Sequence, residues 1–136
     1  MGLRTHTNAE MVHSLKSRAS WMLFLAGIIA VGTFSRMLHT GWVLFDKYLG
    51  DALYAAMVYA ILRLVWRTAA LAVPAMAIMT AIELFQLTMI PARMLASQHL
   101  MVRICARLMG TEFSFLDLLA YGVGIGCIYF ADSSRA

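Results

Sequence analysis

Long apolar runs separated by short polar stretches organise this chain from residue 19 onward. An α-helix needs roughly 20 residues to cross the hydrocarbon core of a bilayer, and four runs approach that length. We therefore predict four membrane spans, at about residues 20–38, 50–66, 69–90 and 114–130. The third span is expected to end at Pro91, because a missing N–H and a fixed φ stop or bend a helix.

The stretch between the third and fourth runs has a different pattern. At about 100° per residue, Arg93, Arg103 and Arg107 fall within roughly an 80° arc of the helix surface. Most apolar side chains of residues 92–109 lie elsewhere on that helix. This pattern predicts an amphipathic helix lying in the membrane interface, and Gly110 is suited to end it. The predicted fold is therefore all-α, an integral membrane four-helix bundle with one interfacial helix.

The chain is expected to form a single membrane domain. Its 136 residues leave no room for a second core. Residues 1–18 are a polar N-terminal segment, residues 19–131 the membrane domain and residues 132–136 a short polar tail. The first apolar run is too long for the core of a secretory signal, so we interpret it as a retained anchor.

Composition supports a membrane environment. The chain is 62% hydrophobic and 13% charged, with a mean hydropathy of +0.76, whereas soluble domains have about 25% charged residues. The net charge of +4 does not indicate nucleic-acid binding, because the basic residues lie between apolar runs and form no patch interleaved with aromatics. Cys105 and Cys127 have no metal-site spacing.

Two polar residues stand inside the third apolar run. Glu83 and Gln86 lie one helical turn apart, and either group is costly in lipid unless it finds a partner or water. With four alternating crossings, the ends of the first and third spans share one membrane face with the beginnings of the second and fourth. That face should hold Arg36, Asp51, Arg93, Asp117 and, one turn after Asp117, Tyr121. We predict a polar pocket there, with Glu83 and Gln86 pointing into it.

Each of these residues also has a purely structural interpretation. Asp51 could cap the second span, and Ser114 to Asp117 matches the pattern of a capping box. The arginines after Pro91 could anchor the chain at lipid headgroups. Glu83 could be neutral and bonded to Gln86 or to a neighbouring span. Residues 122, 124 and 126 are glycines inside a span, which favours close helix contacts over a nucleotide loop.

Catalytic chemistry is not indicated by any motif. The sequence has no G-x-S-x-G and no Ser or Cys placed with a His that could activate it. His39 and His99 have no cluster of other metal ligands around them. We therefore expect a protein that is not an enzyme and that carries no metal or cofactor.

Several motifs resemble a bacterial domain-of-unknown-function family, number 2809, of small membrane proteins with a distant similarity to VanZ proteins. In chain order they are Arg36, Gly50-Asp51-Ala52-Leu53-Tyr54, Glu83-x-x-Gln86-Leu87, Pro91-x-Arg93, Leu108-x-Gly110, Phe113 and Asp117-Leu118-Leu119-Ala120-Tyr121-x-x-Gly124. The resemblance covers about residues 33–126. It implies a bacterial inner-membrane protein whose shared polar positions coincide with the predicted pocket, and it implies no established activity.

Three functional hypotheses follow from this pattern. The first is a non-catalytic component that works by association, as an accessory subunit of a larger membrane complex or in a small oligomer. The second is a binder of an anionic lipid or lipid-linked envelope precursor, with Arg36, Arg93, Arg103 and Arg107 meeting phosphate. The third is an ion or proton path through Glu83. Basic residues flanking the first span favour a cytoplasmic N-terminus and an outward-facing pocket.

Overall fold

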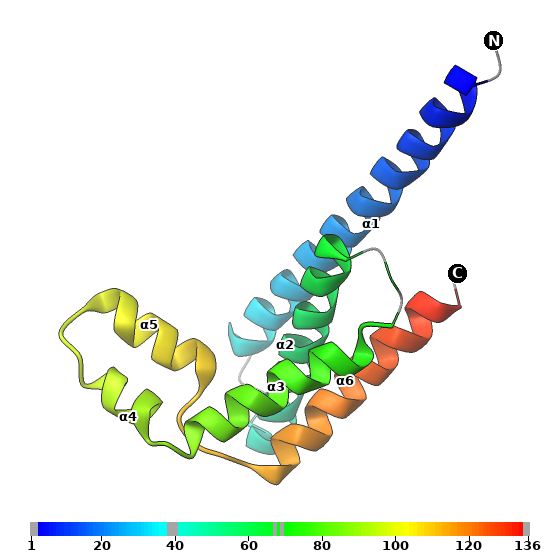
Figure 1. The fold of residues 1–136 in the computed structure, drawn as a ribbon. Coiled ribbons are helices and arrows are strands. Elements are labelled where there is room, and N and C mark those ends of the chain that lie inside the picture. Colours follow the sequence, from blue (N-terminus) through cyan, green and yellow to red (C-terminus); the bar gives the residue numbers. More distant parts are fainter. Residues whose placement is uncertain (1–2, 38–40, 67, 69, 135–136) are drawn as a thin grey trace.

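The structure is a computed structural model that describes residues 3–37, 41–66, 68 and 70–134, and over these residues it is all-α. Six helices follow one another along this part of the chain (Figure 1): α1 Leu3–Met37, α2 Val43–Val65, α3 Ala72–Gln86, α4 Ile90–Leu95, α5 Leu100–Met109 and α6 Phe115–Ser133. Segments of α1, α2 and α6 are long and apolar enough to cross a membrane. The length and composition of these helices fit a multi-pass membrane protein.

Helix α2 lies at the centre of the bundle. It packs against α1, α3 and α6, and α3 also packs along α6 (Figure 1). Helices α2 and α6 run in the same direction, since Ala52 meets Gly124 and, further along both helices, Tyr59 meets Asp132. Helix α3 runs the opposite way beside α6. Helices α4 and α5 form a hairpin at the end where α3 finishes and α6 begins.

The close approach of α2 and α6 depends on one glycine. A Cβ atom at Gly124 would lie 2.2 Å from the carbonyl oxygen of Ala52, so no larger residue fits there without moving a helix. Gly122 and Gly126 have nothing within 4 Å of such an atom. The predicted close helix contact is therefore confirmed at Gly124 and wrong, within this chain, for the other two glycines.

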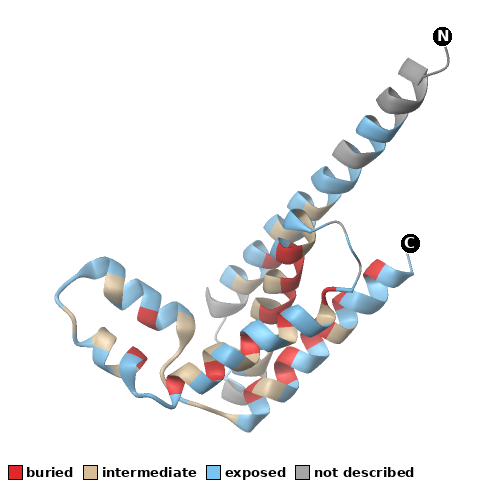
Figure 2. Cartoon of the chain, in the orientation of Figure 1, coloured by how far each residue is buried: buried red, intermediate tan, exposed pale blue. Residues whose placement is uncertain are grey.

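Burial follows a pattern suited to an apolar surrounding. The core contains both small and large side chains, among them Ala55, Tyr59 and Met79, and Figure 2 shows most of the buried residues on α2, α3 and α6. Many other large apolar side chains are exposed. On α1, for example, Leu23 is 75% exposed. Four polar side chains are nevertheless buried in the described part of the chain: Glu83, Gln86, Asp117 and Asp132. Lipid, which does not penalise exposed apolar groups, explains this distribution.

Helices α1 and α2 both begin earlier than the predicted first and second spans. Helix α1 begins at Leu3 and includes most of the polar segment 1–18, which therefore continues the first span as one helix. Helix α2 begins at Val43 rather than near residue 50. Gly50 and Asp51 thus lie inside the helix, and Asp51 cannot cap it. The capping interpretation of Asp51 is wrong because the helix begins eight residues earlier, at Val43.

The single interfacial helix predicted over 92–109 is two helices. Helix α4 ends at Leu95 and α5 begins at Leu100. Between them the Ser97 hydroxyl accepts a hydrogen bond from the His99 backbone N–H, at 3.2 Å. Such short-range bonds from serine compete with helical bonds and favour a turn. Gly110 follows α5 with a φ of +81°, so its predicted role at the end of that helix is confirmed.

The third helix ends before the predicted proline. Helix α3 finishes at Gln86, after 15 residues, and Met89 adopts a left-handed φ of 60°. The Thr88 hydroxyl donates to the Phe85 carbonyl at 2.7 Å and accepts from the Ile90 N–H at 3.3 Å. Pro91 then stands in the first turn of α4, where its missing N–H costs nothing. Pro91 therefore begins a helix instead of ending one.

Candidate functional site

Glu83 is the centre of the predicted polar pocket, and it is 1% exposed. Its Oε1 accepts a hydrogen bond from the Tyr121 hydroxyl on α6 at 2.5 Å and from Gln86 Nε2 at 3.4 Å. Its Oε2 accepts from the Ser114 backbone N–H at 3.4 Å. The carboxyl group therefore joins α3 to α6, and its hydrogen bonds offset the desolvation cost of placing it in an apolar helix.

The Ser114 contact replaces the predicted capping box. In that motif the carboxylate three residues after the cap bonds the cap's own N–H. Here Glu83 from another helix takes the Ser114 N–H, and Ser114 makes no side-chain cap bond. Asp117 pairs instead with Lys47 of α2, at 3.2 Å between Nζ and Oδ1. The capping interpretation of Asp117 is wrong because tertiary partners reach both groups.

Gln86 has one bonded end and one unbonded end. Its Nε2 donates to the carbonyl of Met109 at 2.7 Å, which fixes the orientation of the amide. Its Oε1 is buried and, over the residues that the structure describes, accepts no hydrogen bond. The amide lies against Gly110, where a Cβ atom would come within 3.0 Å of Nε2. Gly110 thus leaves room for Gln86 to reach the end of α5.

These side chains line a cavity of about 260 Å³ at one end of the bundle. Asp51, Glu83, Gln86, Asp117 and Tyr121, five of the seven predicted pocket residues, lie around it. The ionisable carboxyl groups in its lining are Asp51, Glu83, Glu112 and Asp117, and the basic groups are Lys47 and Arg107. Acidic groups therefore outnumber basic groups in the lining, so a purely anionic ligand would meet repulsion.

The arginines that were predicted to lie near the pocket occupy different places in the structure. Arg107, predicted only as a headgroup contact, lines the cavity. Arg93 and Arg103 are exposed and lie outside the lining. Arg36 belongs to the last turn of α1, but its side chain lies outside the described residues. The division of helix 92–109 into α4 and α5 explains the separation, because Arg93 and Arg107 no longer share one helix surface.

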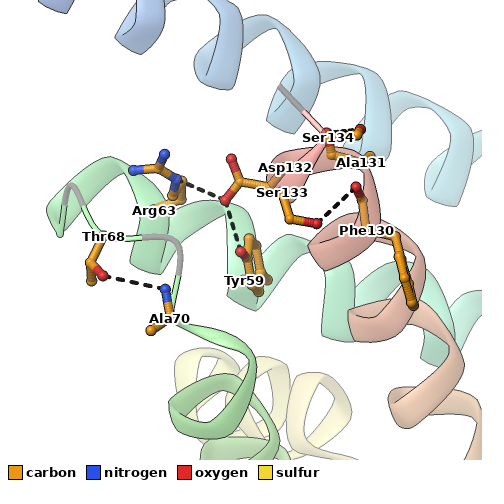
Figure 3. A network of polar contacts seen from close by, with 9 residues as sticks. All are labelled: Tyr59, Arg63, Thr68, Ala70, Phe130, Ala131, Asp132, Ser133 and Ser134. Carbon is orange, nitrogen blue, oxygen red and sulfur yellow. Dashed lines mark hydrogen bonds and ion pairs between the residues drawn. The ribbon is translucent and has the colours of Figure 1, made fainter. Parts of the chain in front are cut away.

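A second polar cluster lies at the opposite end of the bundle (Figure 3). Asp132 Oδ2 accepts a hydrogen bond from the Tyr59 hydroxyl at 2.8 Å and from Arg63 Nε at 2.9 Å. The Arg63 guanidinium carbon lies 5.7 Å from the centre of the Trp21 ring. Asp132 is only 6% exposed, although it was predicted to begin a polar tail.

The sequence contained a weak signal for this second cluster. Helix α6 extends through Ser133, so Asp132 lies on the same helix side as Tyr121 and Ile125. The seven-residue spacing from Ile125 and the position of Arg63 near the end of α2 are visible in the sequence. What could not be read from it is that α2 and α6 run parallel and bring both residues to one level.

The family described as "Protein of unknown function (DUF2809)" matches residues 38–125. This range includes the whole of the cavity lining described above. No curated protein and no solved structure matches the chain.

Proposed function

Because the chain belongs to the DUF2809 family, whose description names no function, we propose a function from the geometry: a non-catalytic protein of the bacterial inner membrane that acts by association. It would serve as an accessory subunit of a larger membrane complex or assemble as a small oligomer. Its interior supports this role, because most of the buried polar groups bond one another and tie helices together.

The observation that carries the proposal is the outward face of α6. Gly122 and Gly126, one turn apart, leave open space at the helix surface. Exposed bulky side chains on the same helix side border this notch: Phe115, Leu119, Val123 and Phe130. Small residues four apart let two membrane helices approach closely, and a notch framed by large side chains can pair with its own copy.

Four crossings complete the proposed topology. Helix α3, at 15 residues, is only about 22 Å long, yet it runs from the end with Asp132 back to the end with Glu83. We assign it as the third crossing, with its ends extended by the residues beside it. The α4–α5 hairpin would then lie in the interface, with Met101, Ile104 and Leu108 turned toward lipid. The N-terminus would be cytoplasmic and the Glu83 cavity outward-facing.

The association can be tested by native mass measurement of the protein released from nanodiscs. We expect an oligomer for the unchanged chain and a monomer for Gly122→Leu/Gly126→Leu, because the added side chains fill the notch. A matched control is Ala77→Leu/Ala81→Leu, which adds the same bulk at two exposed positions four apart on α3. A monomeric unchanged chain that also purifies without a partner from its own membrane would refute the proposal.

A second candidate function is favoured by Gln86. A buried amide oxygen without a partner is costly, and Gln86 lines the cavity together with Arg107. A lipid headgroup, or a lipid-linked envelope precursor, would supply a hydrogen-bond donor to Gln86 and an anionic phosphate to Arg107. The acidic lining disfavours ligands that carry negative charge alone.

This second function is tested by the lipids that remain on the protein. Arg107→Gln should lose a retained lipid in native mass spectrometry, whereas Arg93→Gln should keep it, because Arg93 is exposed and outside the cavity. Equal retention in both variants would contradict the assignment and would leave the association proposal untouched.

A further inference from the structure

A groove at the Asp132 end of the bundle is lined by apolar, charged and small polar side chains. It encloses about 400 Å³ between α1 and α6, with Arg63 of α2 at its inner side. Four of its lining residues, His13, Ser17, Ser20 and Phe24, fall on one side of α1, within an arc of about 60°. Ile128, Ala131 and Asp132 of α6 form the opposite wall.

Polarity changes steadily along this groove. Phe24 and Ile128 line the part that lies deeper in the bundle. Trp21, Arg63 and Asp132 follow at the level where α2 and α6 end. Ser17 and His13 line the part of the groove furthest from the bundle interior, toward the N-terminus of α1. A phospholipid has the same order of groups, with an acyl chain, then a phosphate and then a polar headgroup.

Arg63 lies between the apolar and the polar part of the groove, and its side chain is fixed in an orientation that suits anion binding. Its Nε donates to Asp132, which is itself held by Tyr59, and its guanidinium lies over Trp21. The two terminal nitrogens point away from Asp132 in Figure 3. Arginine presents five N–H donors, so the bond to Asp132 leaves the terminal donors to meet phosphate oxygens. The Arg63 side chain is 17% exposed.

We infer that this groove binds one anionic glycerophospholipid, with its phosphate on Arg63 and an acyl chain along Phe24 and Ile128. Asp132 does not oppose this ligand, because it is buried and its charge is balanced by Arg63. A second cation, Arg18, lines an adjoining cavity together with Arg63 and Glu10. The site shares no residue with the Gly122/Gly126 face or with the Glu83 cavity, so it depends on neither proposed function.

The test measures lipid retention on the full chain. The protein is mixed with phosphatidylglycerol or with phosphatidylcholine of the same acyl chains, and bound lipid is counted by native mass spectrometry. We expect retention of phosphatidylglycerol over phosphatidylcholine in the unchanged chain. Arg63→Gln/Asp132→Asn removes both charges and leaves the net charge of the pair at zero, and it should lower the retention of phosphatidylglycerol about tenfold, as expected for loss of a charge-assisted bond to the phosphate.

Two further variants make the result decisive. Ser20→Trp adds bulk to the groove at an exposed position without changing charge, and it should release the lipid whether or not the double variant folds. Arg103→Gln, at an exposed arginine outside the groove, should retain it. Unchanged retention of phosphatidylglycerol in Ser20→Trp would overturn the inference. Displacement of the lipid by excess inorganic phosphate would also overturn it, because the acyl chain would then contribute nothing.

Discussion

The buried polar side chains each reach a partner on another part of the chain. Glu83 meets Tyr121, Gln86 meets the Met109 carbonyl, and Asp132 meets Tyr59 and Arg63. In an apolar surrounding no water replaces a lost partner, so removing one member leaves the other with its full desolvation cost. These bonds therefore determine which helices pack against each other, because a different packing would leave buried polar groups without partners.

Glu83 offers the simplest test at this scale. Glu83→Ala leaves the Tyr121 hydroxyl and the Ser114 N–H without their acceptor, and we expect a loss of about 2–3 kcal/mol in the free energy of unfolding. Glu83→Gln keeps one acceptor oxygen and should cost clearly less. Denaturant unfolding in detergent measures both variants, with Leu84→Ala, at a 54% exposed position, as the control. Equal losses for Glu83→Gln and Glu83→Ala would contradict the proposed role of the carboxyl group.

Asp132 should behave as half of a buried ion pair. Asp132→Ala leaves Arg63 without its counter-charge, and single removals of this kind cost about 3–5 kcal/mol. Replacing both partners by apolar residues, Arg63→Met/Asp132→Leu, should restore the part of that loss due to the unpaired arginine, while the Tyr59 hydroxyl stays without its acceptor. Thermal unfolding of Arg63→Met, Asp132→Leu and the double variant forms a cycle, and additive losses would show that the two side chains do not interact.

At the scale of the helices, Gly124 should be the most sensitive position in α6. The Cβ atom of Gly124→Ala would press on the Ala52 backbone, and overpacking of this kind costs about 1–3 kcal/mol. Gly126→Ala adds the same atom into open space and should cost nothing in the monomer. Unfolding measured on monomeric protein separates the two. A similar loss in both variants would contradict the Ala52 contact as the cause, because helix propensity favours alanine over glycine at both positions.

The sequence predicted the helical elements better than it predicted their ends. Apolar run length gave the membrane-crossing segments of α1, α2 and α6, because it reports directly on the surrounding solvent. Boundaries at Val43, Gln86 and Leu95 depend on local bonds, such as those of Thr88 and Ser97, that compete with the helical pattern. Such competition is decided by geometry that residue types alone do not specify.

The candidate site was predictable to the same degree. Glu83 and Gln86 are costly in an apolar helix, so a polar pocket could be predicted around them. Alternation of the spans then correctly predicted that Asp51 and Asp117 lie at the same end of the bundle. The same reasoning placed Arg93 with them at the end of the third span, but α3 ends at Gln86, and Arg93 lies on α4, exposed and outside the cavity lining. The Asp132 cluster was missed because a charged residue near a chain end usually marks a tail. Only the length of α6 reveals that it is buried.

In the proposed four-crossing topology, the two polar clusters indicate the position of the molecule in the bilayer. Asp51 and Arg63, one from each end, are twelve residues apart on α2, which is about 18 Å along the helix. A hydrocarbon core is about 30 Å thick, so both clusters should lie a few ångströms inside it. That position accounts for the protein partners of the buried carboxyl groups of Glu83 and Asp132, and for the presence of groups suited to lipid headgroups in the lining of each cavity.

This placement predicts different depths for the two free cysteines. Cys127 is exposed on α6 between the two clusters, and Cys105 is exposed on α5 beside Ile104. A fluorophore on Cys127, in Cys105→Ser protein, should be quenched most by lipids with a nitroxide near mid-chain. A fluorophore on Cys105, in Cys127→Ser protein, should be quenched most by a headgroup nitroxide, because an amphipathic helix lies about 5–10 Å into the boundary region. Equal quenching of Cys105 by both lipids, or none by either, would mean that the α4–α5 hairpin is not interfacial. The depth of Cys127 would still report whether α6 crosses the bilayer, so the two labels test the hairpin and the span independently.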